Sequence, residues 1–165
     1  MTIDICQRLN ALGQAHELIR PSLTDQKPAL ALRDLLAALL AAYDDRGVVG
    51  DRIRFDIPDL LVGEASITSL ALVIHELATN ALKYGALSNS SGSVHISCWV
   101  EEGEVVIIWT EIGGPSISPQ RGQDGFGSKL VHQTINGQLG GTITFEWPPE
   151  GVIVYLRVSR VLLGS

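Results

Sequence analysis

Basic residues are scarce in this chain, which carries 12 Lys and Arg against 18 Asp and Glu, a formal net charge of −6. This balance argues against a general binding surface for nucleic acid or for an anionic membrane. Long apolar runs are missing as well, and the stretch Leu35–Ala42 is far too short to span a bilayer. The N-terminus has acidic and polar residues where a signal peptide needs an apolar stretch. We therefore expect a cytoplasmic protein with no membrane segment in this chain and no nucleic-acid partner.

Cysteine is also scarce. The two thiols, Cys6 and Cys98, are far apart in the sequence and form no CxxC pair, which favours a reduced protein over a disulfide framework. Charged residues make up only 18% of the chain and hydrophobic residues 45%, so the chain is expected to bury a core rather than to be disordered. A length of 165 residues fits a single core with a short appendage.

Hydrophobic periodicity predicts helices first and a mixture of strands and helices later. The longest predicted helix runs from about Ala65 to Tyr84 and ends at Gly85, a favourable residue just past a helix C-terminus. Ile112–Asp124 is rich in Gly and Pro and is expected to be a mobile loop. Strands with interspersed helices predict a two-layer α/β sandwich. The other predicted helices are Thr2–Arg20, Ala29–Tyr43 and Ser128–Asn136, the last stopped by Gly137, and the predicted strands are Arg52–Ile57, Ser93–Val100, Glu104–Thr110, Thr142–Trp147 and Val152–Val158.

The most informative segment is His75–Ser88, in the second half of the longest helix, with the sequence HELATNALKYGALS. At about 100° per residue, Glu76, Thr79, Asn80 and Lys83 share one side, and apolar residues occupy the other. Oxygen ligands from Glu and Asn suit Mg²⁺, which usually keeps several waters and also binds substrate phosphates. A Lys one turn later can meet phosphate charge. Most polar helix faces are only solvated, however, so this face alone does not establish a site.

Two later segments favour a site over a solvated face. Trp109–Pro115 reads WTEIGGP, an apolar strand that ends in an acid and is followed by glycines. Gly125–Leu130 reads GFGSKL, a glycine pair that opens a predicted helix. Three competing motifs fail on a defining residue. The zinc motif HExxH needs a second His where Thr79 stands, the P-loop needs Lys before Ser rather than after it, and a dinucleotide fingerprint needs a glycine where Leu130 stands.

Taken in order, HELATNALKYGALS, WTEIGGP and GFGSKL resemble the N, G1 and G2 boxes of the HWE histidine kinases. That family is named after a His in the N box and a Trp-x-Glu in the G1 box, which correspond here to His75, Trp109 and Glu111. The segment Arg8–Ile19, RLNALGQAHELI, resembles the later part of the family's dimerisation region.

The resemblance implies the nucleotide-binding fold that these kinases share with gyrase, Hsp90 and MutL. This is an α/β (α+β) two-layer sandwich with a Bergerat-type mixed sheet and helices on one face. We expect it to occupy residues 25–165, as the catalytic ATP-binding domain. Residues 1–24 are then expected to be the C-terminal part of a dimerisation or phosphoacceptor-type helix.

The resemblance also implies a site for ATP and Mg²⁺. Asn80 is expected to bind Mg²⁺, and the second catalytic residue, Glu76, to order a Mg²⁺-bound water or to polarise the attacking imidazole. Glu111 is expected to accept a hydrogen bond from the exocyclic amine of adenine. The G2 glycines are expected to offer backbone amides to the triphosphate at a helix start, where the helix dipole favours anions. The expected ATP-binding residues are Asn80, Lys83, Tyr84, Glu111, Gly113, Gly125, Phe126, Gly127, Ser128 and Lys129, with Lys83 pairing with phosphate and Tyr84 flanking the base or ribose.

The function implied is that of the catalytic domain of a two-component sensor histidine kinase. Such a domain transfers the γ-phosphate of ATP to a His for relay to a response regulator. In this family the acceptor His lies upstream of the segment that Arg8–Ile19 resembles. The four imidazoles of this chain, His16, His75, His95 and His132, lie outside an acceptor-like context. We therefore expect the acceptor on an upstream helix or a partner chain, negligible self-phosphorylation of this chain alone, and a homodimer in the full-length parent.

Two other functions stay open from the sequence. A degenerate kinase-like domain would keep the fold as a phosphotransfer or docking protein without using ATP, although Asn80, Glu111 and both G2 glycines are retained. An anti-sigma-factor-type serine kinase would phosphorylate a partner protein, but such proteins usually lack an HWE-type G1 box and a dimerisation-like segment.

Overall fold

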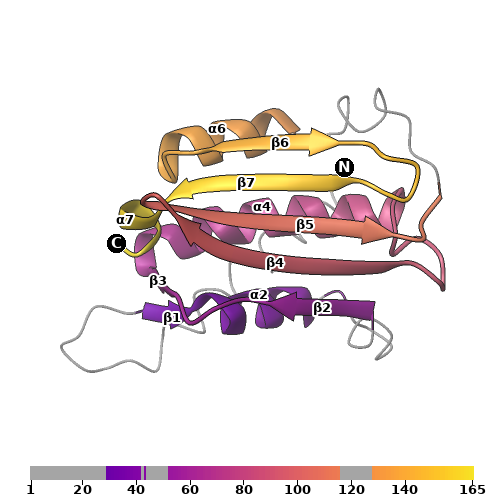
Figure 1. The fold of residues 1–165 in the computed structure, drawn as a ribbon, viewed down its shortest axis with the longest axis horizontal. Helices are drawn as coiled ribbons and strands as arrows, with labels where there is room; N and C mark the ends of the chain where they lie inside the picture. The colour runs from indigo at the N-terminus through magenta and orange to yellow at the C-terminus, as the bar shows by residue number, and fades with distance from the viewer. Residues whose placement is uncertain (1–28, 42, 44–51, 116–127) are drawn as a thin grey trace, which may run out of the picture.

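The computed structural model describes residues 29–41, 43, 52–115 and 128–165. These residues form two layers, a five-stranded sheet and a layer of helices on one of its faces (Figure 1). The predicted two-layer α/β sandwich is therefore confirmed. The elements in chain order are β1 (Ala29–Ala31), α2 (Leu32–Ala41), β2 (Ile53–Asp56), β3 (Leu61–Gly63), α4 (Glu64–Lys83), β4 (Ser93–Glu101), β5 (Glu104–Ile112), α6 (Ser128–Gln138), β6 (Thr142–Glu146), β7 (Ile153–Ser159) and α7 (Arg160–Leu163).

The main sheet is mixed, with the strand order β2-β4-β5-β7-β6. β2 pairs with β4 in parallel, and the other three pairs are antiparallel. The centre of the sheet is the predicted hairpin of β4 and β5, in which Glu101 pairs with Glu104. The two residues between them, Glu102 and Gly103, both have positive φ, 49° and 79°. Two such residues are typical of a type I′ turn, whose twist matches that of the flanking strands.

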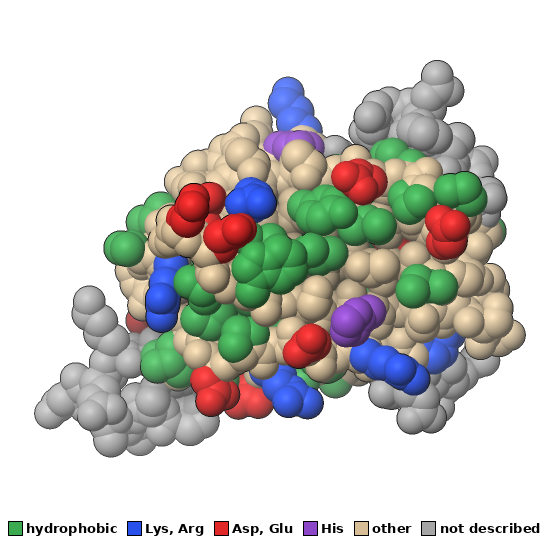
Figure 2. Space-filling view, viewed as in Figure 1, with side chains coloured by type: hydrophobic (Ala, Val, Ile, Leu, Met, Phe, Trp, Pro, Cys, Tyr) green, Lys and Arg blue, Asp and Glu red, His purple; other side chains and the backbone are tan. Residues whose placement is uncertain are grey.

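The core lies between the sheet and the helices α2, α4 and α6. Strand residues alternate between the two faces of the sheet, and Ile96, Trp109 and Val154, which are neighbours across β4, β5 and β7, are all buried on the inner face. No helix of the described residues lies over the opposite face (Figure 1), which carries hydrophobic, acidic, basic and histidine side chains side by side (Figure 2). The apolar side of α4 that the sequence predicts is buried as expected, at Ile67, Leu70, Ala71, Ile74, Leu77, Ala78 and Ala81.

α4 is the helix at the centre of the fold. Among the residues that the structure describes, it alone is long and apolar enough to cross a membrane by length and composition, and 72% of its apolar window is buried inside the protein. Such burial is the pattern of a core helix. α4 begins at Glu64 and its last residue is Lys83, within one residue of the prediction at each end.

Two predicted helix boundaries are wrong in detail. Residues Ala29–Ala31 form the strand β1, which pairs with the unpredicted strand β3, so the helix predicted from Ala29 begins only at Leu32. α6 continues through Gly137 to Gln138, because a single glycine weakens a helix without ending it. The short helix α7 was also not predicted. The predictions for residues 1–24 and for the middle of the loop Ile112–Asp124 lie outside the described residues.

Candidate functional site

Glu111, the acid of the WTEIGGP segment, is buried at the end of β5, with only 4% of its surface exposed. Its Oε1 accepts a hydrogen bond from the backbone N–H of Ala86 at 2.9 Å. Its Oε2 accepts one from the indole N–H of Trp109 at 2.8 Å. Trp109 is two residues earlier on the same strand, so both side chains point to the same inner face. The Trp and the Glu of this segment therefore form one hydrogen-bonded pair.

Burial raises the pKa of Glu111, because it disfavours the charged carboxylate, while the bonds from Ala86 and Trp109 act in the opposite direction. Both neighbours are N–H donors, which favour the ionised form. Two oxygens with one bond each leave further lone pairs, since an ionised carboxylate has about four acceptor positions. The carboxyl group is thus held in a fixed orientation and retains capacity to accept another donor.

Gly85 lies directly against this carboxylate. A Cβ atom on Gly85 would stand 2.1 Å from Oε1 of Glu111. Gly85 directly follows the C-cap residue Tyr84, as predicted, but its φ is not among the positive values of the described residues, so the helix does not end in a left-handed glycine. The end of α4 is instead closed at Tyr84, whose backbone N–H donates to the carbonyl of Asn80. The glycine is required by close approach rather than by backbone conformation.

The loop between α4 and β4, residues Ala86–Gly92, lies against the end of β5. A Cβ on Gly114 would be 2.6 Å from the Cα of Ala86, and a Cβ on Gly113 would be 3.3 Å from the Cα of Gly92. Gly113 also has a φ of +82°, a conformation that glycine adopts most readily. The expected site residue Gly113 thus lies beside Glu111 in space, where the glycines let two backbone segments approach closely.

The predicted polar side of α4 runs from the interior to the surface. Glu76 is 5% exposed and Thr79 is 9% exposed. Asn80 is partly buried, and Lys83 and Tyr84 are exposed. The side chains predicted to act together do share this helix, and the C-terminal end of α4 leads directly through Gly85 to the loop that contacts Glu111. The structure therefore brings the α4 residues and Glu111 to the same end of the molecule.

His75 comes directly before Glu76 on α4 and is 2% exposed. The hydroxyl of Tyr43, just beyond α2, forms a hydrogen bond with Nδ1 of His75. The pKa of Tyr43 is raised to about 12, chiefly by burial and also by the charge of Glu76. A tyrosine that keeps its proton donates this hydrogen bond. Sequence reasoning left the role of His75 open and missed Tyr43, which carries no local motif.

The residues present suit a magnesium ion that is held partly by its substrate. The described ranges contain no group of three or more His, Cys, Asp and Glu side chains that could hold a metal. A Mg²⁺ at the carboxylate of Glu76 and the amide of Asn80 would take its remaining oxygen ligands from water and phosphate, as Mg²⁺ in nucleotide sites usually does.

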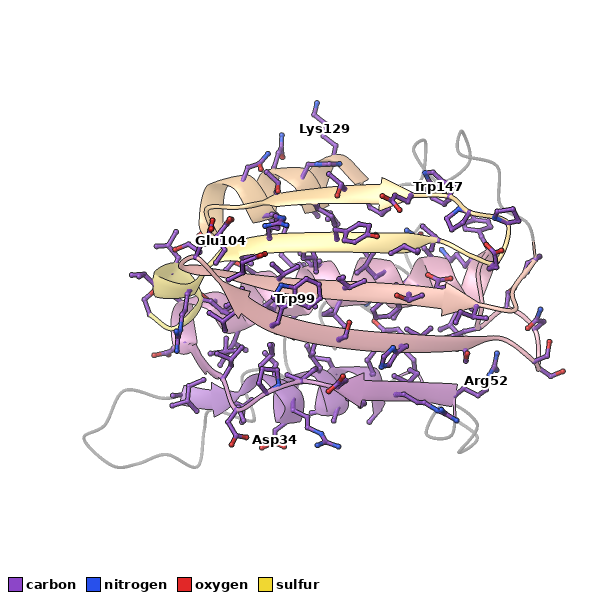
Figure 3. All side chains as sticks on the ribbon, viewed as in Figure 1. Asp34, Arg52, Trp99, Glu104, Lys129 and Trp147 are labelled. Atoms are coloured by element: carbon purple, nitrogen blue, oxygen red, sulfur yellow. The ribbon has the colours of Figure 1, made fainter. Side chains whose placement is uncertain are left out.

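The predicted phosphate-binding segment is only partly described. Gly125, Phe126 and Gly127 lie outside the described residues. Ser128 begins α6, and Lys129 follows it with an exposed side chain that points away from the sheet (Figure 3). The structure thus places a helix start where the sequence predicts one.

Comparison with known proteins agrees with this arrangement. Residues 65–161 match the family described as "Histidine kinase-, DNA gyrase B-, and HSP90-like ATPase". The chain is 36% identical over 150 residues to blue-light-activated histidine kinase 1 of Erythrobacter litoralis (strain HTCC2594), covering 90% of this chain and 41% of that protein. It is also 36% identical over 153 residues to the blue-light-activated histidine kinase of Brucella anthropi, covering 90% of this chain and 30% of that protein. The chain thus spans well under half of the length of either relative.

Two solved structures share the fold. The histidine kinase domain of the Erythrobacter litoralis EL346 blue-light-activated histidine kinase superposes with a TM-score of 0.74 at 20% identity, covering 98% of this chain and 79% of that one. The catalytic domain of the histidine kinase ThkA gives 0.65 at 19% identity, covering 82% and 96%. The Bergerat-type fold is therefore confirmed. Because the family match covers more than half of the residues, the chain belongs to the family of histidine kinase-, DNA gyrase B- and HSP90-like ATPases.

Proposed function

We propose that this chain is the ATP-binding catalytic domain of a two-component sensor histidine kinase. The observation that carries the proposal is the buried Glu111 carboxylate, oriented by Trp109 and Ala86 at the end of the helix that carries Glu76, Asn80 and Lys83. The relatives named above as blue-light-activated histidine kinases support the same class. The alternatives without ATP chemistry do not account for a carboxylate kept buried at this cost in desolvation.

At the base end, the Glu111 carboxylate accepts a hydrogen bond from the exocyclic amine of adenine. It uses a lone pair that the bonds from Ala86 and Trp109 leave available. Guanine presents a carbonyl oxygen at the same position, which a carboxylate repels. At the phosphate end, Lys83 is exposed for a phosphate oxygen. We assign the triphosphate to the backbone amides of Gly125, Gly127 and Ser128, the last of which begins α6, where the helix dipole favours anions. Tyr84, Gly113, Phe126 and Lys129 complete the proposed ATP-binding set.

Asn80 would hold Mg²⁺, with Glu76 nearby either directly or through water. The ion would neutralise charge on the β- and γ-phosphates during transfer. Glu76 polarises the acceptor imidazole, so that its nitrogen forms the new bond to the γ-phosphorus while the bond to the β-γ bridging oxygen breaks and ADP leaves. Catalysis of this kind depends on positioning, because the imidazole must be within reach of the phosphorus.

The acceptor His and the partners complete the proposal. We place the acceptor outside this chain, on its own upstream helix or on a partner chain, and the phosphate then passes to a response regulator. A homodimer in the full-length parent and a cytoplasmic location follow from the same class of protein.

The test uses γ-labelled ATP with the chain alone and mixed with a separate histidine-kinase dimerisation domain. We expect Mg²⁺-dependent ATP binding, negligible labelling of this chain, and acid-labile labelling of the added domain. Acid-stable label on serine would support the anti-sigma-factor alternative, and no ATP binding would support a degenerate docking domain. Stoichiometric acid-labile phosphate on His16 would contradict an acceptor outside the chain.

A further inference from the structure

Arg52 stands immediately before β2 and reaches across to the loop that follows α4 (Figure 3). Its Nε donates to the carbonyl oxygen of Gly92 at 2.7 Å. Its Nη2 donates to the carbonyl oxygens of Ala86 at 2.8 Å and of Asn89 at 2.5 Å. One guanidinium group therefore binds the beginning, the middle and the end of the loop Ala86–Gly92.

The loop has internal bonds of its own. The Asn89 side-chain oxygen accepts from the backbone N–H of Gly92 at 2.9 Å, and the Asn89 amide donates to the carbonyl of Gly113 at 3.1 Å. Asn89 is exposed, so water competes for these contacts. Arg52 adds the bonds that tie the loop to the sheet.

Ala86 connects this arrangement with the carboxylate. Its carbonyl oxygen accepts from Arg52, and its backbone N–H donates to Oε1 of Glu111. The backbone of Ala86 is thus held on both sides, by a cation on one and by the carboxylate on the other. A shift of the loop would move the N–H away from Glu111 or carry the carboxylate with it.

An arginine is suited to this position because its planar guanidinium presents five N–H donors in fixed directions. Lysine carries the same charge, but all its donors are on one nitrogen at the end of a flexible chain. Three carbonyls spread along a loop match the arginine geometry. Hydrogen bonds from a charged donor are also stronger than neutral ones.

We propose that Arg52 is a positioning residue for base recognition, holding the loop Ala86–Gly92 so that the amide of Ala86 fixes the carboxylate of Glu111 against adenine. The proposal rests on the proposed function, in which Glu111 binds the adenine amine. It makes Arg52 a determinant of adenine affinity that does not itself touch the nucleotide.

The experiment compares Arg52→Gln, Arg52→Lys and the control Arg54→Gln in the full chain. Arg54 lies two residues later, on β2, is exposed, and makes no hydrogen bond within the described ranges. Calorimetry measures the affinity for Mg·ATP and for Mg²⁺ with inorganic tripolyphosphate, which lacks a base. For Arg52→Gln we expect the Kd for ATP to rise about tenfold to a hundredfold, with tripolyphosphate affinity unchanged. Arg52→Lys should resemble Arg52→Gln, and Arg54→Gln should resemble the parent.

A readout of the loop itself accompanies the affinities. Hydrogen exchange at the amides of Ala86 and Gly92 should speed up in both Arg52 variants and not in the control. A double-mutant cycle with Glu111→Gln should give less than additive losses of ATP affinity, because both changes remove the same contact to the base.

The outcomes separate the two proposals. A parent chain that binds no ATP would overturn the proposed function and this inference with it. If the parent binds ATP and Arg52→Gln binds it equally tightly, the inference alone would be overturned. Equal losses for ATP and tripolyphosphate would also overturn it, because they would indicate a general structural role. If Arg52→Gln fails to fold, full ATP affinity in a folded Arg52→Lys would equally contradict it.

Discussion

Gly85 and Glu111 are in such close contact that the hydrogen of the glycine occupies the only space between them, since a Cβ would stand 2.1 Å from Oε1 of the carboxylate. The two residues are 26 positions apart and belong to the different motifs HELATNALKYGALS and WTEIGGP. Their contact joins the end of α4 to the end of β5. The base end of the proposed site therefore depends on a residue without a side chain.

Replacing Gly85 with alanine should displace the Glu111 carboxylate and weaken ATP binding. The backbone of Gly85 has no positive φ, so the strain comes from contacts, chiefly the one with Oε1 and also one of 3.0 Å between the new Cβ and the Cα of Ala81. Overpacking of this kind typically costs about 1–3 kcal/mol of the free energy of unfolding. We expect a loss of that order by urea denaturation and a fall in ATP affinity of about tenfold.

Gly137→Ala is the matched control for Gly85→Ala. A Cβ there meets nothing within 4 Å, and the residue is inside α6. Alanine in a helix interior is favoured over glycine by about 1 kcal/mol, so this variant should gain stability and keep its ATP affinity. Unchanged ATP affinity in Gly85→Ala would show that the position of the carboxylate is not critical.

Trp109→Phe tests the pairing between the Trp and the Glu of the G1 segment. Phenylalanine keeps an aromatic ring in the core but removes the indole N–H that donates to Oε2. Leaving a buried acceptor without its donor costs about 1–3 kcal/mol, and the loss of volume adds to this. We expect a lower midpoint of urea denaturation and weaker ATP binding.

The control for Trp109→Phe is Trp99→Phe, at a position that is 42% exposed on the face of the sheet opposite α4 (Figure 3). This change should leave both stability and ATP affinity nearly unaltered. If the two tryptophan variants lose ATP affinity equally, the hydrogen bond to Glu111 is not the cause.

Much of this fold was predictable from local sequence patterns. Apolar residues alternate along β4 before the Glu102–Gly103 turn, β5 after it has the continuous apolar run Val105–Trp109, and α4 shows an apolar stripe over its whole length. By contrast, β1 and β3 have three residues each, which is too short for a period to appear. β1 also passes directly into α2, so its alanines and leucine read as helix.

The long-range contacts of the site were not predictable in the same way. Arg52 bonds to carbonyls 34 to 40 positions away, and backbone acceptors leave no mark in a sequence. The Tyr43–His75 hydrogen bond spans 32 positions, and no local sequence pattern predicts it either. The bond from Trp109 to Glu111 is different, because residues two apart on a strand share a face, and this spacing was available in the motif.

The pH dependence of stability should report on the buried Glu111. Its pKa is raised above its ordinary value of 4.5, chiefly by burial. The folded protein therefore holds this proton more tightly than the unfolded chain does. The free energy of unfolding should fall as the pH rises from about 4.5 through the raised pKa of the folded state.

Glu111→Gln removes the titrating carboxyl group, so its free energy of unfolding should fall less with rising pH than that of the parent. Urea denaturation at several pH values measures this. The substitution should also reduce ATP affinity by roughly 10- to 150-fold, since a hydrogen bond to a charged group is worth roughly 1.5–3 kcal/mol. The contrary result is a variant that keeps the parent's pH profile or binds ATP as tightly as the parent.

Tyr43→Phe tests the hydrogen bond between Tyr43 and His75. It removes the hydroxyl bonded to His75 and should cost about 1 kcal/mol or more of the free energy of unfolding. The folded pKa of Tyr43, about 12, exceeds its ordinary value of 10.0, so the parent should lose stability as the pH rises through that interval. Urea denaturation between pH 9 and 11 should show a shallower loss for the variant, and equal slopes would mean that Tyr43 titrates normally.

Asn80→Ala tests the proposed metal site. Asn80 is partly buried on the polar side of α4, opposite the apolar stripe, so alanine should leave the fold intact and slightly favour the helix. We expect calorimetry to show that Mg²⁺ strengthens ATP binding in the parent and has little effect in Asn80→Ala, whereas metal-free ATP binds both alike. Thr68→Ala, a partly buried polar position two turns before His75 on the same helix, is the control and should retain the Mg²⁺ effect. Because the metal would be held between Asn80 and the phosphates, a Mg²⁺ effect of parent size in Asn80→Ala would remove this residue from the metal site and leave Glu76 as its protein ligand.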